Sequence, residues 1–582
     1  MKKKSNYHKA ILLTSYKDVN LLKKDSNIVG IAGAYPIIQQ SESLDMDYFL
    51  DYPEIAVDFH NLVGEVVSGW YRNKNGFSVF GVHDVSIGAI LSYKLAIEFS
   101  SALRYYFAFK EYVPKYEKIL VSHNIPSSLN LAAKYFSNRI DFFHSENQFD
   151  EHITSSPNRG RTRNPPIHNF LSICLRFLQR PFLKYIKNKV LIINDWTYRK
   201  LNNPDCLNIN KLNPLRTFCL RGGYKYLSLA ERLFPEEIDT DSFILNIQRI
   251  LSEFDIDNKI KRDLTGLFIQ VLHKEYIESR DKLINTYCAY NEMFDYYSPL
   301  MIVVPGYAHT FYQTIFGIAK SRKVPTMLIQ DGNFLCNDKY LFPKDMHSKK
   351  QMIDYFTVPG SYVGSLYKGF FNSNNIKTIN ILPPIIKTHK FGKNKEIIKS
   401  AIVMFPYGMV HSPYCRWDQK YKYVIDVVNT LDDLGYKSIK IKMKEGQDPY
   451  KEKENQLMRT LLNNYNHAGV EMIFGEFSDY LNSAEFVIGY ISAGTIESIY
   501  RDVPYYIYEP QSLGMTDSFI KKSSIIDRNQ IARDLVHLKK LISNNNFVLL
   551  DKDKIFDGID IDEIDFMGIA KRFHSNSLSV IS

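Results

Sequence analysis

The residues best suited to chemistry lie in a short turn near position 490. The run EFVIGYISAGTIES is an apolar strand ending at Gly489, a turn of small residues that includes Gly494, and helical sequence from about Thr495. Backbone N–H groups at the start of a helix, together with the hydroxyls of Ser492 and Thr495, suit a phosphate group. Glu497, in the first helical turn, would accept a hydrogen bond from a ribose hydroxyl.

The same residues also fit an ordinary helix start. In that interpretation Ser492 or Thr495 caps the helix and Glu497 closes a capping box. The chain contains neither G-x-G-x-x-G nor G-x-x-x-x-G-K-[ST]. The sequence therefore gives no support for a dinucleotide fingerprint or a P-loop.

Two nearby segments add polar groups. Lys440, Lys442 and Lys444 alternate along a predicted strand and so share one face, where Lys442 and Lys444 would neutralise a phosphate or a sugar carboxylate. The alternative is three solvated lysines on an edge strand. Tyr407 and Gly408, in FPYGMVHSP, form a turn after another strand, from which they would approach the same phosphate.

A carboxylate and an imidazole follow strands earlier in the chain. KVPTMLIQDGNFL puts Asp331 at the carboxyl end of a strand, the edge at which parallel sheets bind ligands. His309, in VVPGYAHTFY, would orient a ligand or act as a general base. A turn-forming Asp-Gly and a structural histidine are the plainer alternatives. Asp195 and His123 also end strands and rank lower.

Short apolar runs alternating with amphipathic stretches position these residues. Such alternation predicts βαβ units and parallel sheets, and hence an α/β fold of two Rossmann-like domains facing each other across a cleft. Long helical insertions are expected near 88–115 and 227–298, and a linker at 370–396. The predicted strands are 118–122, 189–194, 300–304, 326–330, 400–405, 438–443 and 485–489.

Composition excludes several classes of protein. With 582 residues, 45% hydrophobic and 23% charged, the chain is not disordered, collagenous or a coiled coil as a whole. Its six cysteines show no C-x-x-C spacing, which fits a reducing cytoplasm and argues against zinc ribbons and disulfide frameworks. The acidic run 551–565 lacks oxygen ligands where a calcium loop needs them, so no metal site is expected.

The motif S-x-G-T-x-E at 492–497, after a strand and before Val-Pro and another strand, resembles the nucleotide-sugar half of GT-B glycosyltransferases that build bacterial capsule and lipopolysaccharide. KSIKIKMKEGQDP is similar to a family strand ending in Lys-x-His-Pro, with Lys444 and Glu445 in place of His-Pro. Gln330-Asp331-Gly332 resembles the Glu-Asp-Gly-Phe of retaining β-Kdo (3-deoxy-manno-octulosonate) transferases.

This resemblance implies a metal-independent glycosyltransferase with Asp331 as its nucleophile and CMP-Kdo, or a related nucleotide sugar, as donor. It implies an acceptor and catalytic domain at 1–385, a nucleotide-sugar domain at 386–540, and a tail at 541–582 that packs back on the first. The acceptor would be a growing surface glycan or a lipid-linked sugar.

Three alternatives stay open. One is an inverting GT-B enzyme that uses a UDP-, GDP- or CMP-sugar, with His309 or Asp331 as base. Another is a polyol-phosphate transferase, although the sparse histidines of the C-terminal third count against it. The third is a scaffold without catalysis that binds glycan or membrane.

The net charge of +10 is concentrated in one segment. Residues 151–200 carry ten Lys or Arg against two acidic residues, a net charge of +8. This distribution argues against a nucleic-acid protein with a broadly basic face. Within it, 155–189 alternates apolar and basic residues in part, as in surface-lying membrane segments. The alternative is a core helix with a solvated basic face.

If 155–189 contacts the inner face of the plasma membrane, reversing the charge of Arg176, Arg180, Lys184 and Lys187 to glutamate weakens binding to anionic vesicles, because each basic residue contributes to the attraction. Co-sedimentation with phosphatidylserine-containing liposomes measures the effect. Unchanged binding would favour the solvated face.

Overall fold

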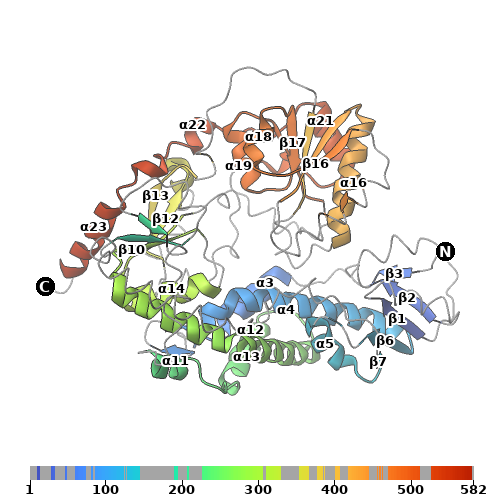
Figure 1. The fold of residues 1–582 in the computed structure, drawn as a ribbon. Coiled ribbons are helices and arrows are strands. Elements are labelled where there is room, and N and C mark those ends of the chain that lie inside the picture. The colour runs from blue at the N-terminus through green and yellow to red at the C-terminus, as the bar shows by residue number, and fades with distance from the viewer. Residues whose placement is uncertain are drawn as a thin grey trace, which may run out of the picture.

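The computed structural model contains several parallel sheets joined by long helices (Figure 1). The residues that the structure describes are 9–13, 28–32, 46–48, 59–73, 80–82, 85–122, 125, 127–143, 189–193, 206–208, 226–305, 310–329, 353–365, 376–383, 386, 400–406, 417–444, 455, 458–459, 462, 469–510 and 526–579.

The C-terminal sheet has six parallel strands in the order β16-β15-β14-β17-β18-β19. Numbered along the chain this order is 3-2-1-4-5-6, that of a doubly wound dinucleotide-binding sheet, in which ligands bind where the strand order reverses. Here that point lies between β14 and β17. The strands are β14 (Ser400–Met404), β15 (Ser438–Lys442), β16 (Val470–Ile473), β17 (Phe486–Gly489), β18 (Tyr505–Tyr508) and β19 (Ile531–Ala532).

The helices of this region follow strands of the sheet along the chain, as the crossover connections between parallel strands require. Tyr421, Val424 and Val428 of α16 pack with the sheet residues Val403 and Ile441 in one core cluster. The helices are α16 (Trp417–Asp433), α18 (Phe477–Leu481), α19 (Ala493–Tyr500) and α21 (Leu535–Ser543).

A second six-stranded parallel sheet lies in the middle of the chain, in the order β13-β12-β11-β10-β8-β9. Every residue of β8, β10, β11 and β12 is buried, as expected of parallel strands covered on both faces. The strands are β8 (Val190–Ile192), β9 (Cys206–Asn208), β10 (Met301–Val304), β11 (Thr326–Leu328), β12 (Tyr355–Val358) and β13 (Lys377–Asn380).

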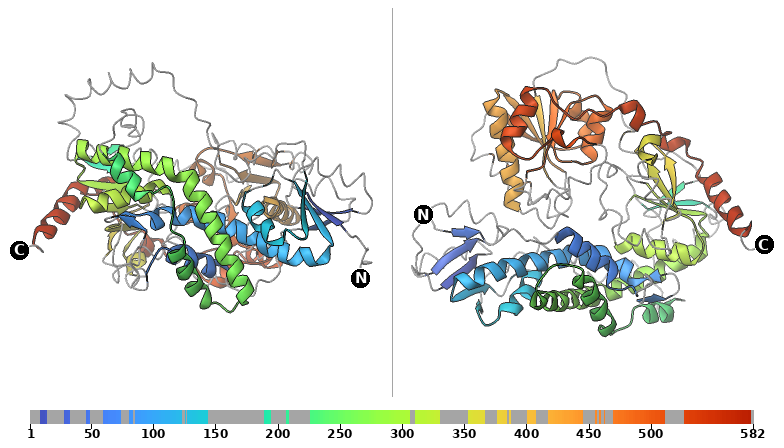
Figure 2. Two further views of the ribbon diagram at one scale, coloured as in Figure 1. Left: turned by 90° about the horizontal axis from the view of Figure 1, so that it is seen from below. Right: turned by 180° about the vertical axis from the view of Figure 1, so that it is seen from behind.

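The C-terminal helix α23 (Phe566–Ser579) returns to this middle sheet, as the view from behind in Figure 2 shows. Phe566, Ile569 and Ala570 share a buried cluster with Ile192, Val303 and other sheet residues. The last segment of the chain therefore covers a face of the middle sheet and lies away from its sequence neighbours in the C-terminal sheet.

A third parallel sheet, of five strands, stands at the N-terminus in the order β3-β2-β1-β6-β7. Its chain order, 3-2-1-4-5, is again doubly wound. The strands are β1 (Lys9–Leu13), β2 (Ile28–Ala32), β3 (Met46–Tyr48), β6 (Lys118–Ser122) and β7 (Ile140–Phe143). A short antiparallel pair, β4 (Gly81–Val82) and β5 (Val85–Ser86), precedes the longest helix of the first third.

Long helices connect the N-terminal and middle sheets. Along the bottom of Figure 1, α4 (Ile87–Tyr112) and the 40-residue α13 (Asn258–Tyr297) contact each other, and both contact α5 (Ser127–Ala133) and α14 (Thr310–Ser321). At 1.5 Å per residue α13 is about 60 Å long. The remaining helices of this layer are α3 (Phe59–Gly69), α11 (Leu227–Leu233) and α12 (Asp241–Ser252).

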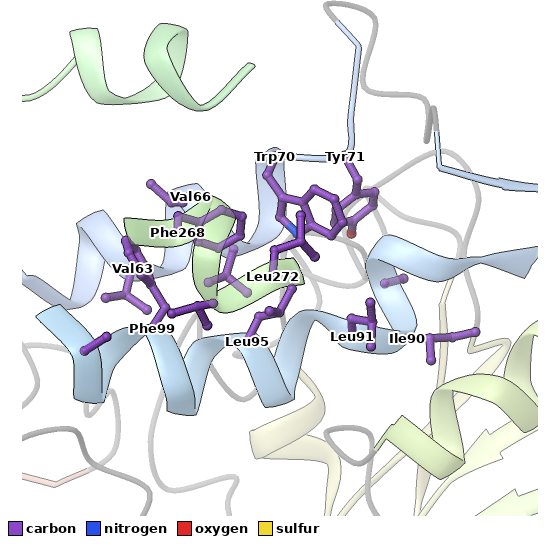
Figure 3. Packing of buried hydrophobic residues seen from close by; sticks show 14 of the residues in the cluster. Val63, Val66, Trp70, Tyr71, Ile90, Leu91, Leu95, Phe99, Phe268 and Leu272 are labelled. Atoms are coloured by element: carbon purple, nitrogen blue, oxygen red, sulfur yellow. The ribbon is translucent and has the colours of Figure 1, made fainter. Parts of the chain in front are cut away.

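Aromatic side chains fill the core of this helical layer. Figure 3 shows Trp70, at the end of α3, between α4 and α13. Its ring meets that of Phe243 edge-on at 4.8 Å between centroids, and Phe99 meets Phe268 in the same way at 5.0 Å. All four rings are buried. Edge-to-face pairs of this kind fix the spacing of the helices.

The α/β class with parallel sheets and helical insertions, predicted from sequence, is confirmed. The third sheet is an addition to the two expected. The predicted linker at 370–396 is wrong in part, because 377–380 form β13 at the edge of the middle sheet. An edge strand pairs on one side only, so its four residues stay partly exposed and lack an apolar run.

No helix in the described parts of the chain is both long enough and apolar enough to cross a bilayer.

The Phe99–Phe268 contact yields a stability prediction. Replacing Phe99 with alanine leaves a cavity between α4 and α13 and lowers the free energy of unfolding by about 3–5 kcal/mol. Urea denaturation followed by tryptophan fluorescence measures it. The matched control is Ile277→Ala on α13, where the side chain is 55% exposed and the change stays within about 0.5 kcal/mol. Equal losses of unfolding free energy in Phe99→Ala and Ile277→Ala would contradict this account of the core.

Candidate functional site

The turn between β17 and α19 lies at the carboxyl edge of the C-terminal sheet, beside the reversal of strand order. Ser492 is the N-cap residue, with extended backbone (φ −154°, ψ 179°). Its N–H donates to Thr495 Oγ1 at 3.0 Å, and Thr495 Oγ1 donates to the carbonyl of Tyr490 at 3.2 Å. The Tyr505 hydroxyl donates to that carbonyl too, at 2.8 Å. Side chains from α19 and β18 therefore hold the backbone of the turn.

Glu509, directly after β18, holds the remaining residue of the turn. Its Oε1 accepts a hydrogen bond from the Ile491 N–H at 3.0 Å, and its side chain is fully buried. Among the described residues, no group hydrogen-bonds to its Oε2. Burial raises the pKa of Glu509 to about 7, although the Ile491 N–H and Arg533 act in the opposite direction. A substantial fraction of this carboxyl is therefore neutral near neutral pH.

The start of α19 has the geometry of an anion site. The first N–H groups of a helix, here those of Ala493 and Gly494, have no acceptor within the helix, and the helix dipole favours negative charge beside them. Gly494 packs so tightly that an added Cβ would lie 3.0 Å from Met404 Cε and 3.3 Å from Phe477 Cε1. A larger residue would require Met404 or Phe477 to shift by a few tenths of an ångström.

Glu497 and Arg501 lie on the buried side of α19. The two side chains form an ion pair of 3.7 Å, and each is less than 5% exposed. Burial lowers the pKa of Arg501, while the charge of Glu497 opposes that shift. The reciprocal bond that closes the N-terminal turn comes from Thr495, so Glu497 does not serve in a capping box. Its predicted contact with a ribose hydroxyl stays a prediction.

The alternating lysines lie on β15, which pairs with β14 on one side and β16 on the other. The alternative of an edge strand is therefore wrong. Lys442 is 8% exposed, and its Nζ donates to the carbonyl of Met443 at 2.7 Å. Lys440 lies 3.9 Å from Glu471. Lys444, beyond the end of the strand, is exposed. Lys442 thus adds a buried positive charge at the carboxyl edge of the strand beside β14.

Four predicted site residues, namely Asp331, His309, Tyr407 and Gly408, lie outside the described residues, as do the lower-ranked Asp195 and His123 and nearly all of the basic segment 155–189. Their neighbours are described. β14 ends at Met404, three residues before Tyr407, at the same sheet edge as the β17–α19 turn. Asp331 follows β11 of the middle sheet by three residues.

Sequence reasoning missed Glu509. The signal was available in YYIYEP, where a carboxylate directly follows four buried aromatic or apolar residues and precedes proline. A charge immediately after a fully buried strand lies at the ligand-binding edge of a parallel sheet. The surrounding Tyr423, Tyr505 and Tyr508 are also buried, and the rings of Tyr423 and Tyr508 stack at 5.1 Å.

Within the described ranges, no three His, Cys, Asp or Glu side chains gather as they would to hold a metal ion.

Comparisons with known proteins give little information on the family or the function of the chain. No protein-family model matches the chain, and no curated protein matches its sequence. Among solved structures, UDP-GlcNAc 2-epimerase of Methanocaldococcus jannaschii, crystallised with UDP-GlcNAc and UDP, aligns with a TM-score of 0.35 and 10% identity. The alignment covers 53% of this chain and 91% of that one. At that TM-score the likeness carries no functional inference.

The turn yields a prediction. Thr495→Val keeps the shape of a fully buried side chain but removes the hydroxyl that joins Ser492 to Tyr490. Leaving a buried N–H without its acceptor lowers the free energy of unfolding by about 1–3 kcal/mol, which urea denaturation measures.

The matched control is Thr430→Val on α16. Its hydroxyl donates to the Asp426 carbonyl four residues back, which also belongs to the helix ladder. The expected loss is no more than about 0.5 kcal/mol. If both variants lost the same stability, Thr495 would have no special role in the turn.

Proposed function

We propose that the chain is a glycosyltransferase that transfers a sugar from a nucleotide-sugar donor to a growing surface glycan or a lipid-linked acceptor. The observation that carries the proposal is the strand order of the C-terminal sheet, together with the turn at its reversal point. A doubly wound sheet binds nucleotides at this edge, and here a helix N-terminus and a buried lysine are both found there.

The donor phosphate would contact the first N–H groups of α19 and the hydroxyl of Ser492. The predicted contact of the Thr495 hydroxyl gives way to its role inside the turn, where it is buried and bonded to Ser492 and Tyr490. Gly494 keeps this end of the helix close to β14. Lys442 and Lys444 would contribute positive charge, and Tyr407 and Gly408 would approach from the end of β14. Fixed dipoles and cations of this kind stabilise a leaving nucleotide without a metal.

The best candidate for the donor is a CMP-linked ulosonate such as CMP-Kdo. Asp331 would attack its anomeric carbon as the bond to the phosphate oxygen breaks, and CMP would leave with the bonding electron pair. An acceptor hydroxyl would then attack the anomeric carbon and lose its proton to solvent, while Asp331 leaves as a free carboxylate. Two inversions retain the anomeric configuration, as in two-step glycosidases. His309 would orient the donor.

In the proposed reaction, each domain binds a different substrate or supplies a different group. Residues 1–385 would bind the acceptor and supply Asp331, residues 386–540 would bind the nucleotide, and the tail 541–582 would join the two through its contact with the middle sheet. Residues 155–189 would bring the enzyme to an anionic membrane surface on the cytoplasmic side, where lipid-linked acceptors are found.

The test combines binding with donor turnover. CMP, UDP and GDP are compared for their effect on the melting temperature, because a ligand that binds only the folded state raises it. CMP-Kdo is then incubated with wild-type protein, Asp331→Ala, and the surface control Asp281→Ala. We expect CMP to stabilise all three, and CMP release to fall by at least about a hundredfold in Asp331→Ala alone.

Near-normal release by Asp331→Ala would contradict the nucleophile. Inverted product configuration by NMR would favour the inverting alternative. Stabilisation by a nucleotide without turnover of any nucleotide sugar would favour the scaffold without catalysis.

A further inference from the structure

Glu509 has a position that the proposed function leaves unexplained. It lies directly after β18, one strand beyond the reversal point, and reaches the turn at Ile491. Its Oε1 holds the Ile491 N–H, while its Oε2 is buried without a hydrogen-bond partner among the described residues. A buried carboxyl oxygen without a donor is costly, so it calls for a reason.

The other hydrogen bonds of the turn show what Glu509 contributes to its shape. Thr495 holds both neighbours of Ile491, through the Ser492 N–H and the Tyr490 carbonyl, from within α19. Tyr505 and Glu509 hold the Tyr490 carbonyl and the Ile491 N–H from β18. Without Glu509 the middle residue of the turn would have no side-chain acceptor, and the orientation of the peptide that leads into α19 would be free to change.

We propose that Glu509 is a positioning residue that fixes the Tyr490–Ser492 turn in the shape in which the first turn of α19 binds the donor phosphate. The carboxyl is fully buried with one oxygen on the Ile491 N–H, and burial favours its neutral form in this role. This inference rests on the proposed function for the identity of the ligand. The hydrogen bond to Ile491 is a feature of the free protein.

The neutral state follows from the surroundings. The burial that raises the pKa of Glu509 to about 7 is opposed only in part by Ile491 and Arg533. Arg533 Nη1 donates at 2.5 Å to the backbone carbonyl of Glu509. In the described part of the chain, the other titratable groups around it include Tyr423, Tyr490, Tyr505 and Tyr508, and burial raises the pKa of Tyr423, Tyr505 and Tyr508.

Ionisation of Glu509 would put a negative charge behind a site for a phosphate. The phosphate would then be repelled, so nucleotide binding weakens as pH rises through about 7. By linkage, nucleotide binding raises the pKa of Glu509 further and takes up a proton. A carboxyl that acts only as a packing element would give binding that does not change over this range.

The test uses the full chain, with CMP and UDP as probes, in titration calorimetry between pH 5.5 and 8.5. Glu509→Gln keeps an oxygen for the Ile491 N–H but cannot ionise. It should bind at pH 6 as wild type does, and about tenfold more tightly than wild type at pH 8.5. Glu509→Leu offers no acceptor and should bind at least about tenfold more weakly at pH 6, because the competent turn is less populated.

Hydrogen–deuterium exchange without nucleotide gives an independent measurement. Peptides covering 486–500 should exchange faster in Glu509→Leu and as in wild type in Glu509→Gln. The matched control, Tyr423→Phe, removes another buried hydroxyl that has no hydrogen-bond partner among the described residues but keeps the ring stacked on Tyr508. It should leave exchange, affinity and pH profile unchanged.

The outcomes separate the two proposals. Wild-type protein that binds neither these nucleotides nor a nucleotide sugar contradicts the proposed function. Unchanged exchange at 486–500 in Glu509→Leu overturns the positioning role whatever the ligand. If Glu509→Leu does not fold, the pH profile of Glu509→Gln decides, and a profile equal to that of wild type overturns the neutral carboxyl.

Discussion

The candidate site depends on one constraint, that the polar backbone groups of a buried turn must find partners. Where β17 gives way to α19, Tyr490, Ile491 and Ser492 have left the strand ladder and have not yet entered the helix ladder. Thr495, Tyr505 and Glu509 supply the missing partners. Because two of these three come from β18, the shape of the turn depends on the register in which β18 pairs with β17, Val487 opposite Tyr505.

The helical layer imposes a similar constraint on the first half of the chain. There α4 and α13 meet over a core of aromatic rings, yet the same interface contains Lys94 paired with the buried Glu275. Glu98 on α4 has its pKa raised to about 7, first by burial and then by the charge of Glu275. Removing Lys94 would take one of two cations from the buried Glu275, whose other partner is Lys274 on its own helix, so the pair links α4 to α13 at this level.

The sequence predicted well where one physical signal was dominant. Runs such as KILVS and EFVIG are too apolar to be anything but buried strands, and the structure has strands there. It predicted poorly where pairing with a neighbouring strand decides whether and where a segment joins a sheet. KTIN of β13 has no apolar run and becomes a strand only because β12 offers it an edge. Lys440 and Lys442 were weighed as edge residues because a single sequence does not tell which strands lie on both sides of β15. Glu509 was missed because its partner, Ile491, is 18 residues away in sequence.

The return of the chain to the middle sheet gives the molecule two crossings between the middle sheet and the C-terminal sheet. One runs from β13 to β14 and the other from α21 to α22 (Lys552–Ile555). The second crossing also contacts the far end of α19, where Lys552 pairs with Asp502 at 3.0 Å and Phe556 packs on the ring of Tyr500. The helix whose first turn forms the candidate site therefore ends against the segment that carries the chain back to the middle sheet, so its two ends touch structure from both sides of the crossing.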